Sequence, residues 1–157
     1  MIRVGLGIDA HPIEPERSLV LGGVTIPDAP GLAGHSDADV LCHAIADALL
    51  GAAGLGDLGS NFPPTDRWQD ASSLEILSET ARQLTDDGWV ISNLDATMIA
   101  EAPRVGPLIP EMKAAVARAL AIDDSMVSLK ATSTDGLGFV GRREGLAAIA
   151  VALIEKH

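Results

Sequence analysis

Three of the four histidines in this chain fall within its first 43 residues, and they constrain the possible folds more than any other feature. Asp9 and His11 are two residues apart, so an extended backbone would direct both side chains to one side of a strand. His43 follows in a stretch whose apolar residues have helical spacing. A strand and a helix that pack together would bring one carboxylate and two imidazoles into contact. Such a set can hold Zn²⁺ with its fourth position open, as catalytic zinc sites require.

A simpler interpretation of the same residues stays open on spacing alone. A D-x-H pair with a distant histidine is a weak signal, and His11 and His43 could be ordinary polar residues at the edges of secondary structure. Two observations favour a metal site. His43 is surrounded by apolar residues such as Leu41 and Ile45, where an imidazole without a partner would cost free energy. Histidine is also rare in the chain and is concentrated in this region.

Apolar or alternating stretches separated by turn residues predict about five strands. The clearest local signal is Gly22-Gly23, which predicts a two-residue hairpin between strands at 19–21 and 24–26. The other strands are predicted at 2–8, 89–100 and 127–131. The tail 146–154 is apolar throughout, so its periodicity is compatible with either a buried helix or a buried strand.

Apolar residues at helical spacing predict three helices. They are expected from Ser36 to Gly51 or Gly54, from Ser72 to Gly88, and over roughly 107–121. Ser36 and Asp39 resemble a capping box at the start of the first helix. The segments 56–66 and 138–142 are rich in turn-forming residues and are predicted to be loops.

Together these elements predict an α+β fold of two layers, in which a mixed β-sheet packs against about three helices. At 157 residues the chain is long enough for one sizeable core, and residues 1–157 are expected to form a single domain. A hydrophobic content of 47% is sufficient for such a core and argues against disorder.

The net charge of −11 argues against nucleic acid as a partner, because binding nucleic acid normally requires a basic face. A phosphate ester would also be repelled unless metal cations supplied positive charge. The chain opens without the pattern of a secretory signal, and no apolar run is long enough to cross a membrane. The single Cys42 excludes an intramolecular disulfide and fits a reducing compartment, so we expect a cytoplasmic protein without a membrane partner.

Short motifs follow one another in order along nearly the whole chain. Beside His43, they are G-x-G-x-D-x-H at 5–11, H-S-D-x-D at 35–39, G-D-x-G at 56–59, F-P-x-T-D at 62–66, A-x-A-P at 100–103, K-A-T at 130–132 and L-G-F-x-G-R at 137–142. Together they resemble the 2-C-methyl-D-erythritol 2,4-cyclodiphosphate synthase family of the non-mevalonate (MEP) isoprenoid pathway. One such motif would be a weak signal, whereas the ordered series is specific.

The resemblance implies a bacterial, cytoplasmic enzyme that forms a homotrimer with active sites between neighbouring subunits. It implies Zn²⁺ bound by Asp9, His11 and His43, and a second cation, Mg²⁺ or Mn²⁺, that bridges the substrate diphosphate near Asp135. In the implied reaction, the 2-phosphate of 4-diphosphocytidyl-2-C-methyl-D-erythritol 2-phosphate attacks the β-phosphorus. CMP leaves and 2-C-methyl-D-erythritol 2,4-cyclodiphosphate forms. A phosphate nucleophile is mostly ionised at pH 7, so no general base is required.

The resemblance also assigns residues to the parts of the substrate. His35 and Ser133 are implied to be catalytic, with His35 orienting the transferred phosphate and stabilising the transition state next to Ser36, Asp9 and His11. The methylerythritol part is implied to contact Asp57, Leu58, Gly59, Phe62, Pro63, Thr65 and Asp66. The cytidine phosphate side is implied to come from the adjacent subunit, through Ala100, Glu101, Ala102, Pro103, Arg104, Ala131, Thr132, Ser133, Thr134 and Asp135. Phe139 and Arg142 are implied to lie near the trimer axis, where the family has a cavity for isoprenoid diphosphates.

Three positions depart from the family pattern. Ser133 stands where Thr is usual, Asp135 where Glu is usual, and Pro64 where an acidic residue is usual. None of these changes removes a zinc ligand, and the second-cation site is the part most affected, because the Asp135 carboxylate is one methylene shorter. Simpler roles also stay open for other residues: Ser36 as a helix cap and Arg142 as a member of a salt bridge.

Two other functions are compatible with the sequence. A zinc-dependent phosphohydrolase would use the open zinc position to activate water. A non-catalytic trimer would use Phe139 and Arg142 only to bind isoprenoid diphosphates.

Overall fold

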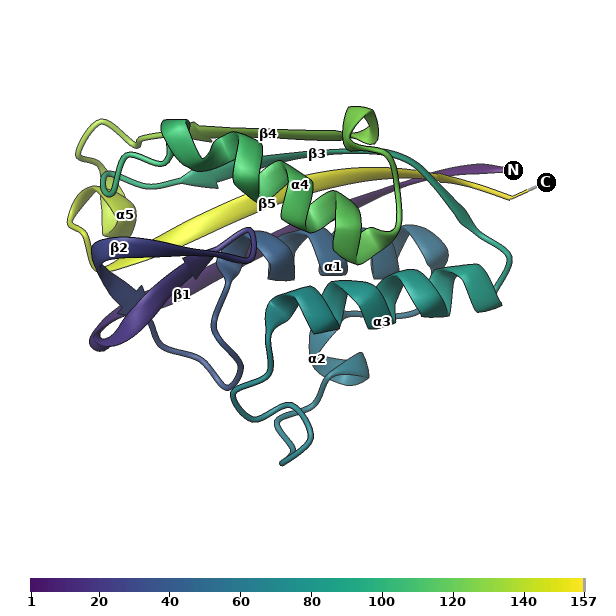
Figure 1. Ribbon diagram of the computed structural model, residues 1–157, viewed down its shortest axis with the longest axis horizontal. Helices are drawn as coiled ribbons and strands as arrows, with labels where there is room; N and C mark the ends of the chain where they lie inside the picture. Colours follow the sequence, from purple (N-terminus) through teal and green to yellow (C-terminus); the bar gives the residue numbers. More distant parts are fainter. Residues whose placement is uncertain (157) are drawn as a thin grey trace.

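The computed structural model describes residues 1–156 and consists of a five-stranded mixed sheet with helices on one side (Figure 1). The strands are β1 (Ile2–Leu21), β2 (Val24–Leu32), β3 (Val90–Ile99), β4 (Val127–Thr132) and β5 (Gly145–Glu155), in the order β2-β1-β5-β3-β4. Only β3 and β4 pair in parallel; the other neighbours are antiparallel. The predicted α+β class with a mixed sheet is therefore confirmed.

Five helices accompany the sheet, two of them single turns. They are α1 (Val40–Ala53), α2 (Leu58–Asn61), α3 (Ser73–Asp86), α4 (Ile109–Leu120) and α5 (Gly138–Gly141), with 3₁₀ turns at Gly106–Leu108 and Asp124–Met126. α1 packs on β1 and β5, and α3 packs against both α1 and α4 (Figure 1). None of the helices described over residues 1–156 has the length and apolar character needed to span a bilayer.

β1 is much longer than the predicted strand at 2–8, because it changes partner midway. Up to Pro12 it pairs with β5, and from Ile13 it pairs with β2. Its second half carries prolines and charged residues and shifts register between Glu14 and Ser18, so it has no clean alternation in sequence. The structure also resolves the apolar tail as the strand β5, which is paired on both edges.

The Gly22-Gly23 hairpin is confirmed. Leu21 pairs with Val24, and both glycines have positive φ angles, +56° and +75°, as a type I′ turn requires. The predicted loops at 56–66 and 138–142 are wrong in part, because each contains a single helical turn. In α2 this turn is stabilised by Asp57 and Ser60, whose side chains cap each other's backbone N–H groups.

The start of α1 differs from the prediction. Asp39, and not Ser36, is the N-cap, and its carboxylate accepts the N–H of Cys42 at 3.1 Å. The same buried carboxylate accepts the N–H groups of Gly22 at 3.0 Å and Gly23 at 2.7 Å, so it joins the hairpin turn to the helix. Burial raises the pKa of Asp39. Ser36 is thereby free for a different partner. The cap of α3 at Ser72 is confirmed; its side chain accepts the N–H of Leu74.

Gly5 and Gly7 allow β1 and α1 to approach at backbone distance. A Cβ atom at Gly5 would overlap the carbonyl oxygen of Ala48, and one at Gly7 would overlap that of Ala44. Both glycines lie on the helix-facing side of β1, the same side as Asp9 and His11. The absence of two side chains therefore sets the spacing between the strand and the helix that carries His43.

Gly7→Ala is expected to destabilise the protein by about 3 kcal/mol, because the added methyl group has no space and α1 must move. Gly51→Ala is the matched control. Beyond its chain neighbours and the nearby backbone of its own helix, a methyl group at Gly51 in α1 would meet no described atom within 4 Å, so alanine there should stabilise the helix by about 0.5–1 kcal/mol. Urea unfolding of both variants measures the two effects. Equal stabilities would contradict the close packing of β1 on α1.

Candidate metal centre

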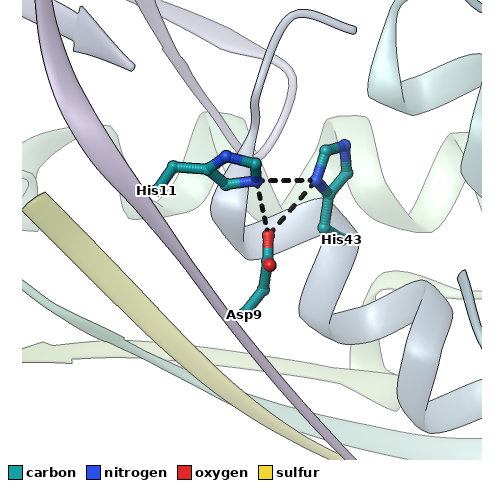
Figure 2. Close-up of side chains that lie close together, drawn as sticks. All are labelled: Asp9, His11 and His43. Carbon is teal, nitrogen blue, oxygen red and sulfur yellow. Dashed lines mark hydrogen bonds and ion pairs between the residues drawn. The ribbon is translucent and has the colours of Figure 1, made fainter. Parts of the chain in front are cut away.

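Asp9, His11 and His43 converge on one point between β1 and α1 (Figure 2). Oδ2 of Asp9 lies 2.8 Å from Nε2 of His11 and 3.2 Å from Nδ1 of His43, and the two nitrogens are 3.1 Å apart. Among residues 1–156, these three side chains form the one group of His, Cys, Asp or Glu residues with the geometry to hold a metal ion. The sequence spacing therefore placed these three side chains correctly.

The hydrogen bonds of His11 orient it as a ligand. Its Nδ1 lies 2.8 Å from the carbonyl oxygen of Ala33, and a carbonyl can only accept, so Nδ1 carries the proton. Nε2 then faces Asp9 and His43 and is the ring nitrogen available to bind a metal. A metal-binding histidine usually donates the N–H of its other ring nitrogen to a backbone carbonyl or a carboxylate, as His11 does here.

The side chains of the cluster shift each other's pKa values. Burial disfavours the Asp9 carboxylate, but hydrogen bonds and charge from His11 and His43 outweigh it and lower the pKa of Asp9 to about 2. Burial likewise opposes the imidazolium of His11, yet the hydrogen bond and charge of Asp9 raise its pKa. One carboxylate and two imidazoles suit Zn²⁺ better than Mg²⁺ or Ca²⁺, which prefer oxygen ligands. The three residues therefore fit a divalent transition-metal site.

A cavity of about 190 Å³ opens beside this cluster. Its lining consists of Asp9, His11, His35, Ser36, His43, Leu58, Gly59, Phe62, Pro64, Trp68 and Ile76. The predicted His35, Ser36, Leu58, Gly59 and Phe62 are thus brought to the metal cluster. Asp57, Pro63, Thr65 and Asp66 are outside the lining, although the carbonyl oxygen of Thr65 accepts from His35 Nε2 at 2.9 Å.

Sequence reasoning missed three lining residues, Pro64, Trp68 and Ile76. Trp68 packs edge-to-face on Phe62, with ring centroids 4.9 Å apart, and so closes one wall of the cavity. A signal was present, because Trp68 is one of only two tryptophans in a chain with 3% aromatic residues, and it lies next to the predicted substrate loop.

A second cavity, of about 730 Å³, lies at the carboxyl ends of the parallel strands β3 and β4. It is lined by Ala100, Glu101, Pro103, Arg104, Val105, Gly106, Pro107, Ile109, Ala131, Thr132 and Ser133. The strand pairing brings its two distant segments together, since Ala100 N–H donates to Thr132 O at 2.9 Å. No residue lines both this cavity and the one beside the metal cluster.

Glu101 organises the turn that follows β4. Its carboxylate accepts the N–H of Thr134 at 2.8 Å and of Gly136 at 3.3 Å, and these bonds lower the pKa of Glu101. Ala102, Thr134 and Asp135 do not line the second cavity. Asp135 also does not join the Asp9–His11–His43 group of the same chain.

Phe139 and Arg142 lie in and just after α5, apart from both cavities. Phe139 is 43% exposed. The Arg142 guanidinium donates to Glu144 at 2.8 Å, so within one chain it forms the ordinary salt bridge that was the simpler interpretation. That pair is exposed, and such pairs contribute little to stability.

Comparisons with known proteins give a consistent result. The model of the YgbB family matches residues 2–155. A relative from Desulfatibacillum aliphaticivorans is 53% identical over 98% of this chain and 100% of its own length, and one from Listeria monocytogenes is 51% identical over 99% and 100%. Both are named 2-C-methyl-D-erythritol 2,4-cyclodiphosphate synthase.

Solved structures agree over the same length. IspF of Plasmodium falciparum, in a CDP complex, superposes with a TM-score of 0.87 at 30% identity, covering 99% of this chain and 96% of that one. The bifunctional IspDF of Campylobacter jejuni gives a TM-score of 0.95 at 37% identity; this chain covers 43% of that longer protein.

Proposed function

Since this chain belongs to the YgbB family, we propose that it is a 2-C-methyl-D-erythritol 2,4-cyclodiphosphate synthase of the non-mevalonate isoprenoid pathway. The substrate is 4-diphosphocytidyl-2-C-methyl-D-erythritol 2-phosphate. A bond forms from an oxygen of its 2-phosphate to the β-phosphorus, the bond from the β-phosphorus to the bridging oxygen breaks, and CMP leaves with that electron pair. The convergence of Asp9, His11 and His43 beside a cavity carries this proposal.

Zn²⁺ would be held by Asp9, His11 and His43, and Mg²⁺ or Mn²⁺ by Asp135 and the substrate diphosphate. Bound there, the two cations would supply Lewis-acid polarisation and neutralise the diphosphate charge. Cations are needed because the chain has a net charge of −11 and its substrate is also anionic, so the two would otherwise repel each other.

The chain's own residues position the substrate. His35, held by the carbonyl of Thr65, and Ser36 face the cavity where the phosphates would meet. Leu58, Gly59 and Phe62 would enclose the methylerythritol part, with Asp57, Pro63, Thr65 and Asp66 fixing the loop around it. Ser133 would contact the phosphate from the cytidine side, where the segments Ala100 to Arg104 and Ala131 to Asp135 would surround the nucleotide. No side chain has to remove a proton, because a phosphate oxygen is the nucleophile.

We also propose a homotrimer in which each active site joins two chains. The face of β1 that points away from α1 exposes Ile2, Val4, Leu6 and Ile8, each by 60–68%. Such a continuous aliphatic stripe is typical of a surface that another subunit covers. Neighbouring copies would bury it and place one chain's nucleotide cavity against the next chain's metal cluster. Phe139 and Arg142 would then lie near the axis; isoprenoid diphosphate binding there, and a cytoplasmic location, stay predictions.

Product analysis tests the function. Incubation of the protein with the cytidine substrate and Mg²⁺ is expected to yield CMP and the cyclic diphosphate, identified by phosphorus NMR, and a chelator should stop the reaction. Inorganic phosphate as the product would instead indicate the phosphohydrolase. No turnover under any metal condition would favour the non-catalytic isoprenoid-binding protein.

A further inference from the structure

His43 contacts two serine hydroxyls on the side of its ring that faces away from Asp9. Its Nε2 lies 2.9 Å from Oγ of Ser73, the first residue of α3, and 3.0 Å from Oγ of Ser36. Ser73 is fully buried and His43 is 6% exposed, so these contacts are shielded from water. Neither the cavity beside the cluster nor the predicted site includes Ser73.

The Ser73 hydroxyl can donate to one neighbour only, and this fixes which hydrogen bond it accepts. Its proton is donated to Oδ1 of Asp37, a carboxylate that also accepts the backbone N–H of Ser73 at 2.9 Å. A carboxylate only accepts, so the hydroxyl oxygen is left to accept from the ring. His43 must then carry its proton on Nε2. Its Nδ1, the atom that faces Asp9 and His11, is then the ring nitrogen left to bind the metal.

We propose that Ser73 and Asp37 are positioning residues that hold His43 in the Nε2–H tautomer and aim its Nδ1 at the metal. This inference rests on the proposed function, because Ser73 and Asp37 would act by orienting a side chain that is proposed to bind zinc. Ser36 cannot fix the tautomer by itself: it accepts the N–H of Ala38 at 3.3 Å, and within residues 1–156 its own proton has no carboxylate to direct it. The α3 helix is thereby connected to the metal centre, although it supplies no ligand.

Ser73→Ala removes the hydroxyl and little else. Alanine is a good helix former at this first position of α3, and its backbone N–H can still donate to Asp37. Zinc affinity is expected to fall about 10- to 100-fold, measured by competition between the zinc-stripped protein and a chromophoric chelator. Ser78→Ala is the control from the same helix, because the Ser78 hydroxyl donates to the carbonyls of Leu74 and Ala119, away from the cluster. Its zinc affinity should match that of the wild type.

A second measurement reads the tautomer without any metal. In ¹⁵N NMR of the zinc-free protein, Nε2 of the wild-type His43 should carry a proton, because the Ser73 oxygen accepts it. In Ser73→Ala the protonation of Nε2 should decrease, because Asp9 still accepts from Nδ1. A Ser73→Ala protein with wild-type zinc affinity and the same protonation of Nε2 would overturn the proposal. A wild-type protein that binds no zinc would contradict the proposed function instead, and the NMR comparison would still decide the role of Ser73.

Discussion

Replacement of His43 by alanine is expected to abolish zinc binding and turnover together. The side chain supplies one of three converging ligand atoms, and its Nδ1 lies 3.2 Å from Asp9 and 3.1 Å from His11. Losing a ligand should cost more affinity than the about 10- to 100-fold typical of changes around a ligand. Since a catalytic metal supplies several kcal/mol of transition-state stabilisation, turnover should fall by roughly 10³-fold or more. Metal analysis and a CMP-release assay measure the two losses.

His35→Asn is the matched control for this variant. His35 lines the same cavity but lies outside the three-residue cluster, so its replacement should lower turnover and leave the zinc content unchanged. Asp9→Asn, which keeps the size of the side chain, should behave like His43→Ala. Full zinc occupancy in both His43→Ala and Asp9→Asn would refute the ligand set.

Two inactive variants are expected to restore activity when they assemble into one trimer. His43→Ala disables the metal side of the site, and Ser133→Asp places a carboxylate where the cytidine phosphates would bind. If each site combines the metal side of one chain with the nucleotide side of the next, every trimer that contains both variants keeps about one third of its sites intact. Coexpression of the two chains with different tags, purification over both tags and activity assay give the result.

The control pair has both defects on the same side. His43→Ala coexpressed with Asp9→Asn should stay inactive in every assembly, because each site then receives a defective metal side. Absence of recovery in the first pair, while the purified assembly is a trimer, would show that each chain carries a complete site. Recovery in the control pair would show that the metal side is assigned to the wrong residues.

The metal cluster could be predicted because it depends on local periodicity. Asp9 and His11 share a face of any extended strand, and His43 lies about one turn inside a helix whose apolar spacing is regular. The exact helix start was not predictable in the same way. Ser36 and Asp39 both resemble caps in sequence, and the choice depends on Gly22 and Gly23, whose N–H groups the Asp39 carboxylate also accepts.

Long-range pairing explains most of what the sequence could not show. The full length of β1 depends on its exchange of partners at Pro12 and Ile13, which no local pattern records. The position of Ser73 beside His43 likewise depends on how α3 packs on α1, and the neighbouring cap Ser72 already explains a serine at this helix start. Trp68 was missed for a different reason, because its contact with Phe62 lies within one irregular loop, where no strand or helix periodicity marks it.

The close contact of β1 with α1 bears on metal selectivity. The ligands come from two different elements, so the separation of the main chains determines the size of the ligand triangle. Zinc requires nitrogen and oxygen donors at about 2.0–2.2 Å, whereas Ca²⁺ accepts about 2.3–2.6 Å. A homologue that tolerated a side chain at Gly5 or Gly7 would have a wider triangle and a weaker preference for small ions. Discrimination between cations would therefore originate in part from two strand positions that supply no ligand atom.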